Sequence, residues 1–231
     1  MQPYTYPYLG YFQLIKSIDT FVFFDDVQFI RRGFINRNNI LINGKANKFT
    51  VPVIKGSQED LISQIKISAE MYAIWRGKFL KSLKLSYKKA PHFEQAYRLV
   101  ESVLNEDFNH IASLAKHSII STCNYLGLER NFIDSSSLDY NRLGTGEDKI
   151  LDICRIIEAS SYVNSINGKD LYHDKTFNHR GIELLFIEPD LQPYKQGIPV
   201  FEGYLSIIDA LMWMAPEDLQ SHLDSYRLIE K

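Results

Sequence analysis

Two adjacent carboxylates, Asp25 and Asp26, follow a short apolar run at 20–24 that is typical of a buried strand. Neighbouring residues of a strand point to opposite faces. We therefore expect one carboxylate to face a cleft and the other to cap a turn or to pair with an arginine such as Arg31 or Arg32. A carboxylate at this position can act as a general base for an amine or hydroxyl, or as a ligand of Mg²⁺. A turn without a catalytic role is the alternative interpretation.

The first ten residues predict a rigid aromatic loop that leads into a helix at 11–17. Pro3 and Pro7 each fix the backbone φ angle and lack an N–H, which excludes regular helix and strand. Gly10 relieves the steric limits on the backbone just before the helix. The free N–H groups at a helix N-terminus suit an anionic or polar ligand. The candidate ligand contacts of this loop are Gln2, Pro3, Tyr8 and Gly10.

A basic stretch without any acidic residue extends from 27 to 58. Its cations are Arg31, Arg32, Arg37, Lys45, Lys48 and Lys55. The planar guanidinium of Arg37 can bind a carboxylate or phosphate, and the amide of Asn36 can orient sugar hydroxyls. We therefore predict a positive surface for a phosphate-bearing ligand, with Asn36 and Arg37 as contacts. The alternative is a charged edge strand whose cations prevent aggregation.

Two further candidates lie in the C-terminal third. A loop at 164–172 follows a predicted strand, bends at Gly168 and can present backbone N–H groups to an anion. Its glycine spacing fits neither a Walker loop nor a dinucleotide-binding fingerprint. The expected contacts in this loop are Asn164, Gly168 and Tyr172. Asp209 lies in an apolar helical run, where a buried carboxylate is costly unless it has a hydrogen-bonding partner or a role in ligand binding, so Asp209 is a further candidate contact.

The order of the predicted elements indicates an α/β fold with a Rossmann-like, mostly parallel core. The turn signal Asn43-Gly44 predicts a β-hairpin at 38–53. Helical spacing over about 71–126 is interpreted as a helical insertion within a single domain that spans 1–231. The other expected strands are 20–24, 62–67, 131–134, 161–166 and 182–188.

Strand–helix–strand order implies parallel pairing with right-handed crossovers. Ligands of open α/β sheets bind beyond the carboxyl ends of the strands. In this chain that rule selects the positions after Phe24, Ile133, Ile166 and Ile187.

The composition excludes several classes of protein. A net charge of −2 argues against a general nucleic-acid binder. No apolar run reaches the roughly 18 residues of a membrane span, and the start lacks the features of a signal peptide, so we expect a cytoplasmic protein. The two cysteines are expected as buried thiols. The six histidines are scattered, so no metal site is expected.

The pattern QPY-x-x-PY-x-GYFQLI, followed by FVFFDDVQFI-x-RGFINRN, resembles the opening of the WbqC-like family of bacterial proteins. The resemblance continues through 49–53, 150–154, 168–172 and 205–209. It implies a role in O-antigen or surface-polysaccharide biosynthesis, as an acyl or aminoacyl transferase that modifies a sugar, with glycine as one candidate donor. The implied partners are a nucleotide-sugar or another phosphate-bearing small molecule. The sequence identifies neither the donor nor a cofactor.

Two other functions stay open. The first is an adenylylating enzyme on a nucleotidyltransferase-like scaffold, although Tyr8-Leu9-Gly10-Tyr11 stands where that class carries H-x-G-H, so the usual cation is missing. The second is a non-catalytic carbohydrate-binding protein of the same pathway.

This chain departs from its relatives in two places. Relatives read more like N-P-x-G-G-Q near 164–169, where this chain has Ser165, Asn167 and Lys169. Relatives also carry an apolar first strand before the Gln-Pro loop, whereas this chain begins at Met1. We therefore expect that strand to be missing, or the start to have been assigned too late.

Overall fold

The computed structural model describes residues 1–57 and 59–231. The α-helices are α1 (Leu9–Lys16), α2 (Ala69–Tyr87), α3 (Phe93–Asn105), α4 (Ile111–Tyr125), α5 (Gly146–Ile156), α6 (Asp174–Asn178), α7 (Ile207–Trp213) and α8 (Pro216–Leu223). The strands are β1 (Thr20–Phe23), β2 (Arg37–Ile42), β3 (Lys45–Thr50), β4 (Asn131–Asp134), β5 (Ser161–Ser165), β6 (Glu183–Pro189) and β7 (Tyr226–Glu230). Short 3-10 helices cover Ile62–Gln64, Ser135–Ser137 and Ile166–Leu171.

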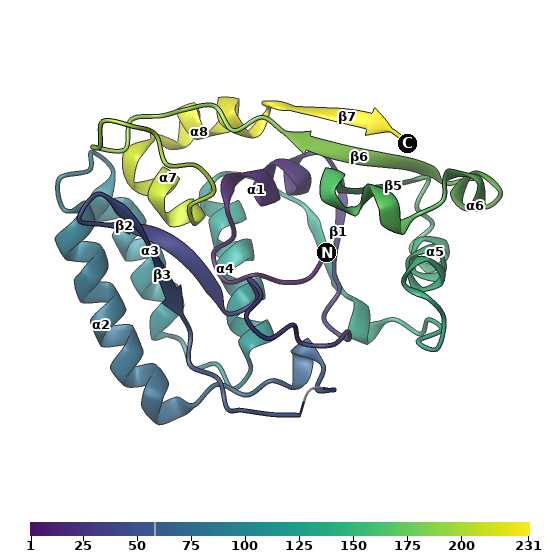
Figure 1. Ribbon diagram of the computed structural model, residues 1–231, viewed down its shortest axis with the longest axis horizontal. Coiled ribbons are helices and arrows are strands. Elements are labelled where there is room, and N and C mark those ends of the chain that lie inside the picture. Colours follow the sequence, from purple (N-terminus) through teal and green to yellow (C-terminus); the bar gives the residue numbers. More distant parts are fainter. Residues whose placement is uncertain (58) are drawn as a thin grey trace.

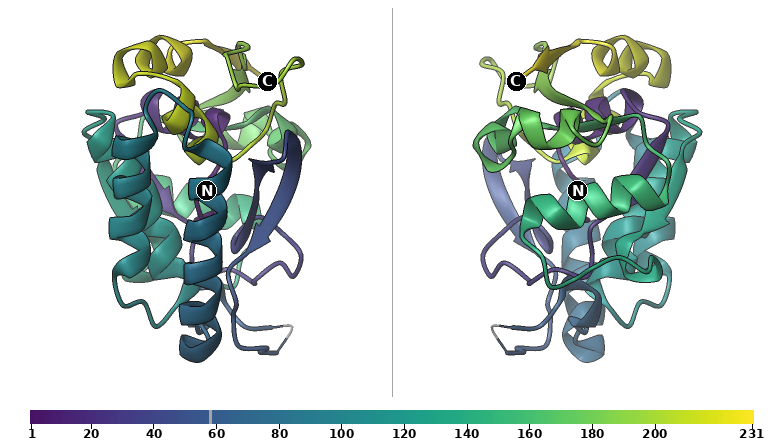
Figure 2. Two further views of the ribbon diagram at one scale, coloured as in Figure 1. Left: turned by 90° about the vertical axis from the view of Figure 1, so that its left-hand side faces the viewer. Right: turned by 90° about the vertical axis from the view of Figure 1, so that its right-hand side faces the viewer.

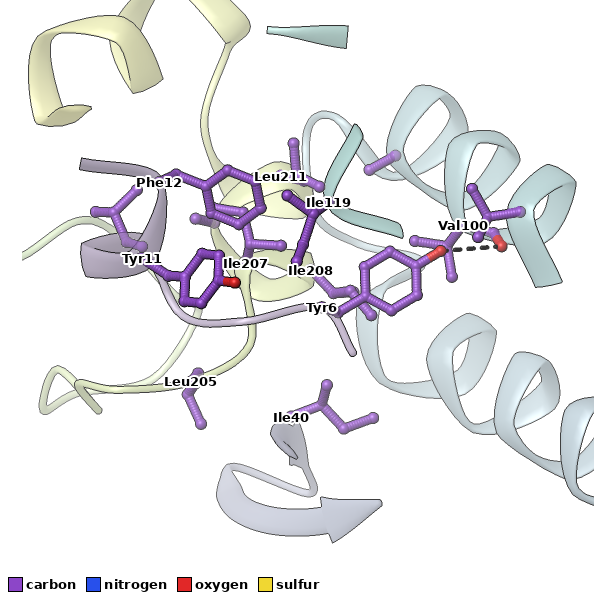
Figure 3. Close-up of a cluster of buried hydrophobic side chains, with 14 of the residues drawn as sticks. Tyr6, Tyr11, Phe12, Ile40, Val100, Ile119, Leu205, Ile207, Ile208 and Leu211 are labelled. Atoms are coloured by element: carbon purple, nitrogen blue, oxygen red, sulfur yellow. Dashed lines mark hydrogen bonds between the residues drawn. The ribbon is translucent and has the colours of Figure 1, made fainter. Parts of the chain in front are cut away.

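The helix α1 lies near the centre of the molecule (Figure 1), and residues 9–15 are all buried. The loop before it also contributes to the core, because Tyr6 is buried and its hydroxyl donates to the Val100 carbonyl at 3.4 Å. Figure 3 shows Tyr6 and Phe12 among side chains that come from α4, α7 and the hairpin, such as Ile119 and Ile208. The opening of the chain is therefore as much a structural element as a candidate binding loop.

The helices α2, α3 and α4 together span 69–125, which matches the helical stretch expected at about 71–126. Views from the two sides show α2 in front on one side and α5 in front on the other (Figure 2). Gly127 follows α4 with a φ of 67°, as expected of a residue that ends a helix. Within residues 1–57 and 59–231, no helix is long and apolar enough to cross a membrane.

The predicted hairpin is confirmed as β2 and β3, which pair in antiparallel register with Ile42 opposite Lys45. Asn43 and Gly44 form the connection with φ angles of 52° and 72°. Two consecutive positive φ values define the tight turn that matches the twist of a hairpin, and Asn-Gly is the preferred pair for it.

The sheets confirm a mixed α/β fold, whereas a Rossmann-like core stays a prediction. β1 and β4 form a two-stranded parallel sheet, with Phe21 opposite Phe132. β5 and β6 are also parallel, but β7 joins β6 in the antiparallel sense, so the three-stranded sheet is mixed. The two parallel pairs thus belong to separate sheets.

The predicted strand at 62–67 is wrong. Ile62–Gln64 is a 3-10 helix, and the stretch after it contributes only isolated bridges from Lys66 and Ile67. Ile62 and Ile65 are both buried, and their three-residue spacing is the repeat of a 3-10 helix. The run is short enough for its apolar pattern to fit either structure.

Two edge strands, β1 and β5, line the same cavity of about 320 Å³, which we name the strand slot. Its wall includes residues 20–22 and Phe24 at the β1 side and 161–164 at the β5 side. Leu14 of α1 and Ile153 of α5 add apolar surface. The slot therefore runs along the length of both strands.

Met1 occupies one end of the strand slot. Its amino group donates to the Val22 carbonyl at 3.0 Å, and the amide of Phe24 donates to the Met1 carbonyl at 2.9 Å. This slanted pair of hydrogen bonds around Phe23 is the pattern of a parallel strand. Burial lowers the pKa of the Met1 amino group to about 5. In a fusion protein the charged amino group of Met1 would become an uncharged peptide N–H, which is less costly to bury.

A five-residue Val-Ile-Val-Ile-Val segment fused to Met1 should raise the melting temperature by about 4–8 °C. A strand that pairs with both edges and buries apolar side chains contributes roughly 2 kcal/mol, and each kcal/mol shifts Tm by about 2–4 °C at this size. Differential scanning calorimetry measures the shift. A Gly-Ser segment of equal length is the control, and equal Tm values for the two fusions would show that the slot does not take a strand.

Candidate functional site

The opening loop, residues 2–10, connects the ends of several elements. The amide of Asn38 on β2 and the hydroxyl of Ser206 both donate to the Tyr6 carbonyl, at 2.6 and 2.8 Å. The amide of Ile207 in α7 donates to the Pro7 carbonyl at 2.8 Å. These bonds hold one end of the loop against β2 and α7, while its other end adjoins β1 at the strand slot.

Asp25 is buried in a dense set of donors just after β1, with 1% of the residue exposed. Lys116 of α4 places its Nζ 2.6 Å from Oδ2, and the Ser136 hydroxyl donates to the same atom at 3.1 Å. The Ser136 amide donates to Oδ1 at 3.0 Å, and the Ser135 hydroxyl approaches it at 3.3 Å. Oδ2 therefore has two donors and Oδ1 has one, beside a Ser135 hydroxyl whose single proton is shared with Asp26, and Lys116 also reaches Asp134 at 2.8 Å.

Asp26 has its own partners. Oδ1 accepts from the Tyr140 hydroxyl at 2.8 Å and also from the Ser135 hydroxyl, while Oδ2 accepts from Nε of Arg142 at 2.9 Å. The Arg142 guanidinium lies over the Tyr140 ring, 4.5 Å from its centre. Burial, together with the hydrogen bond to Asp26, raises the pKa of Tyr140 well above its usual range. The hydroxyl therefore stays a donor to the carboxylate.

The arrangement of the two aspartates differs from the sequence-based expectation in two ways. The strand ends at Phe23, so strand alternation does not apply, and both carboxylates turn toward Ser135. The cation that pairs with Asp26 is Arg142. The expected candidates lie elsewhere: Arg31 donates to the Gly56 carbonyl, and Arg32 is exposed with a φ of 66°.

Sequence reasoning did not identify Lys116, Tyr140 or Arg142 as members of this cluster. A signal existed for the serines, because the position after Ile133 was one of the expected strand ends. Ser135 and Ser136 follow β4 directly and meet the aspartates that follow β1. The parallel pairing of β1 with β4 brings these two ends together.

Arg37 and Asn36 have different environments. The Asn36 side chain is buried and donates to the Val51 carbonyl at 2.9 Å, so it serves the hairpin. Arg37 is half-buried at the start of β2, and its Nε is buried without a hydrogen-bond partner. Within residues 1–57 and 59–231 the Arg37 guanidinium forms no ion pair.

Asp209 is fully buried in the first turn of α7 and accepts three hydrogen bonds from uncharged groups. The hydroxyls of Tyr87 and Tyr194 and the amide of Gln196 each donate to it at 2.8 Å. Burial raises the pKa of Asp209, against the opposing effect of these three donors. Burial and the adjacent carboxylate also raise the pKa of both tyrosines. The cluster joins the end of α2, α7 and the segment before it.

The remaining residues of the opening loop are mostly packed. The Gln2 carbonyl accepts from the Tyr11 hydroxyl at 2.8 Å, and Pro3 is buried. Gly10 lies inside α1, and a Cβ there would stand 2.5 Å from the Tyr8 ring. The glycine therefore allows the half-buried Tyr8 ring to pack over the start of α1, a role different from the predicted one at the helix entrance.

The Gly168 loop is a 3-10 helix that begins after β5. Gly168 is buried, and a Cβ there would lie 3.0 Å from the Asn164 amide nitrogen. The Tyr172 hydroxyl is 3.2 Å from that of Tyr162. Asn164 lines the strand slot together with Met1 and Phe24, so the start of this loop shares the slot with Met1, the residue before the opening loop.

The chain matches the WbqC-like protein family over residues 2–221 and therefore belongs to that family. It is 28% identical over 214 residues to the uncharacterized protein Rv1507c of Mycobacterium tuberculosis (strain ATCC 25618 / H37Rv). That alignment covers 91% of this chain and 90% of the relative. No solved structure matches the chain. The opening loop, both aspartates and Arg37 all lie within the matched residues.

Proposed function

We propose that the protein is a transferase that adds an acyl or aminoacyl group to a sugar during surface-polysaccharide assembly. Membership of the WbqC-like family supports the pathway. We further propose that the sugar is carried by a phosphate-bearing molecule, such as a nucleotide-sugar, which binds beside the opening loop.

The observation that carries this proposal is the buried Nε of Arg37, which has no hydrogen-bond acceptor within residues 1–57 and 59–231. A buried donor without an acceptor costs about 1–3 kcal/mol. Nε of Arg37 is such a donor, and it belongs to a stretch of sequence without acidic residues. A phosphate oxygen would satisfy the donor and neutralise the charge, and guanidinium–phosphate hydrogen bonds are among the strongest in proteins. The anion of the ligand is therefore assigned to Arg37.

Within this proposal Asp26 is the candidate general base, and Asp25 is a positioning residue. The Lys116 ammonium and the Ser136 hydroxyl occupy Oδ2 of Asp25, the Ser136 amide occupies Oδ1, and the residue is 1% exposed, so a substrate cannot reach either oxygen. Within the part of the chain that the structure describes, Oδ2 of Asp26 has one donor, Nε of Arg142. The Asp26 side chain is 5% exposed and that of Arg142 is 42% exposed, so in this proposal a substrate amine or hydroxyl reaches Oδ2 by displacing Nε of Arg142, whose Nη2 stays bonded to the Leu138 carbonyl at 2.8 Å.

Arg37→Ala should weaken the binding of phosphate-bearing ligands by about 10- to 100-fold. This range corresponds to the roughly 1.5–3 kcal/mol of a hydrogen bond to a charged group. A thermal-shift screen of nucleotides, nucleotide-sugars and acyl-coenzyme A compounds identifies a ligand of the wild type. Calorimetric titration then measures its Kd with each variant.

Arg32→Ala is the matched control, because Arg32 belongs to the same basic stretch but is exposed. It should change the Kd by less than about two-fold. Equal losses in the two variants would indicate a diffuse charge effect and would contradict a specific phosphate site at Arg37.

A second candidate is a non-catalytic carbohydrate-binding protein of the same pathway. One observation favours it: every carboxylate oxygen of Asp25 and Asp26 already has a hydrogen-bond donor. Such saturation is typical of a structural network as well as of an active site. An adenylylating enzyme is less well supported. Tyr11 occupies a position where that class carries a histidine, and its uncharged hydroxyl donates to the Gln2 carbonyl.

A further inference from the structure

Tyr204 has an unusual conformation for a large side chain. Its φ is 58°, in the left-handed region, and the residue is 73% exposed. A bulky residue is rarely found there, because its Cβ crowds the backbone, whereas glycine would adopt the same turn freely. The ring also gains little burial to offset this cost. Strain of this kind clusters at binding and catalytic sites.

The loop that carries Tyr204 is held at its base by Gln196, which is buried. The Gln196 amide nitrogen donates to the Glu202 carbonyl at 2.9 Å, and its amide oxygen accepts from the Glu202 N–H at 2.8 Å. The same nitrogen donates to Asp209 at 2.8 Å. A buried carboxylate thus fixes the loop through Gln196, and the position of Tyr204 is set in advance of any ligand.

The neighbours of Tyr204 are mainly aromatic and apolar, with two polar side chains, Gln192 and Glu202, among them. The ring centre lies 5.7 Å from that of Tyr8 in the opening loop, at an interplanar angle of 41°. Tyr8, Tyr204, Glu202 and Gln192 lie around one cavity of about 10 Å³, which is too small for a sugar, so a ligand would pack on the exposed outer face of the Tyr204 ring. Glu202 is exposed, and within residues 1–57 and 59–231 its carboxylate has no ion-pair partner.

We propose that Tyr204 and Glu202 form a subsite for the sugar ring of the phosphate-linked sugar, a proposal that rests on the proposed function. The apolar C–H face of a pyranose packs on an aromatic face, whose negative quadrupole attracts C–H groups. A carboxylate beside the ring accepts hydrogen bonds from sugar hydroxyls. The Tyr204 loop runs next to β2, which begins at Arg37. The Ser206 amide, two residues after Tyr204, donates to the carbonyl of Asn39, two residues after Arg37, at 2.8 Å.

The test compares wild type, Tyr204→Gly and Phe34→Ala by calorimetric titration with UDP, UDP-glucose and UDP-N-acetylglucosamine. Phe34 is a matched control, because it is an exposed aromatic residue beside Tyr4 of the opening loop. Saturation-transfer NMR with methyl glucoside and methyl N-acetylglucosaminide adds a probe without phosphate. Differential scanning calorimetry gives the Tm of each protein.

We expect wild type to bind at least one UDP-sugar about ten-fold more tightly than UDP. Tyr204→Gly should remove this advantage, leave the Kd for UDP unchanged and maintain or raise Tm, because the strain is relieved. Phe34→Ala should keep the advantage. The saturation-transfer signal of the methyl glycosides should disappear in Tyr204→Gly.

Three results would overturn the sugar subsite. One is a wild type that binds the UDP-sugars no more tightly than UDP and gives no saturation-transfer signal with the methyl glycosides. Another is a Tyr204→Gly protein that still binds the UDP-sugar more tightly than UDP, or whose Tm is lower than that of wild type. Either result would mean that the Tyr204 ring contributes to packing and not to sugar binding. A third is a Tyr204→Gly protein whose affinity for UDP falls as much as its affinity for the UDP-sugars, which would mean that the Tyr204 ring packs on the uracil base. Failure of the phosphate site is distinguishable, because it removes UDP binding and leaves the methyl glycosides bound.

Discussion

Replacing Lys116 with methionine should lower the free energy of unfolding by about 3–5 kcal/mol. Methionine keeps most of the packing but removes the ammonium that lies 2.6 Å from Asp25. The Lys116 side chain is 14% exposed and that of Asp25 is 1% exposed, so solvent cannot replace the lost partner. Breaking a buried ion pair on one side costs this much because it leaves an uncompensated charge. Urea denaturation followed by circular dichroism measures the loss.

Lys81→Met is the control, because Lys81 is exposed and forms no ion pair within the part of the chain that the structure describes. It should change the free energy of unfolding by less than about 0.5 kcal/mol. Adding Asp25→Asn to Lys116→Met should recover at least about 1 kcal/mol, because the charge left unpaired is then absent. A loss below about 0.5 kcal/mol for Lys116→Met would mean that the serine donors alone hold Asp25.

The elements that could be predicted from the sequence are those with local signals. Asn43-Gly44 is sufficient for the hairpin turn, since few other pairs tolerate two positive φ angles. The long helices were predictable because their apolar residues repeat over more than three turns. The run at 62–67 was too short for its spacing to distinguish a strand from a 3-10 turn. β7 pairs with β6 across a long connection, and no local signal indicated that pairing.

The candidate site illustrates the same limit. Asp25 and Asp26 could be selected because they follow a buried strand. Their cations come from 91 and 116 residues away, Lys116 on α4 and Arg142 in the loop after β4. Neither cation is distinguished locally from other surface lysines and arginines. Only the pairing of β1 with β4 and the packing of α4 bring them to the carboxylates.

Replacing Asp209 with alanine should lower the free energy of unfolding by about 3 kcal/mol or more. The change leaves three buried donors without their acceptor, from Tyr87, Tyr194 and Gln196. Each unsatisfied buried group costs about 1–3 kcal/mol. Asp209→Asn keeps the shape and one acceptor oxygen, so its loss should be smaller, about 1–2 kcal/mol. Equal stability of the alanine variant and wild type in urea would show that the cluster contributes nothing.

The pH dependence of the same cluster has a definite sign. Burial raises the pKa of Asp209 above its ordinary value of 3.8, so the folded state keeps this proton at pH values where the unfolded state has lost it. Stability falls with rising pH wherever the folded state binds more protons. The stability of wild type minus that of Asp209→Asn should therefore decrease as pH rises from 3.8 through the raised pKa of the folded protein, and then level off. Urea denaturation of both proteins across this range measures the difference. A difference that instead grows with pH would mean that the three hydrogen bonds outweigh burial and that Asp209 is held as a carboxylate.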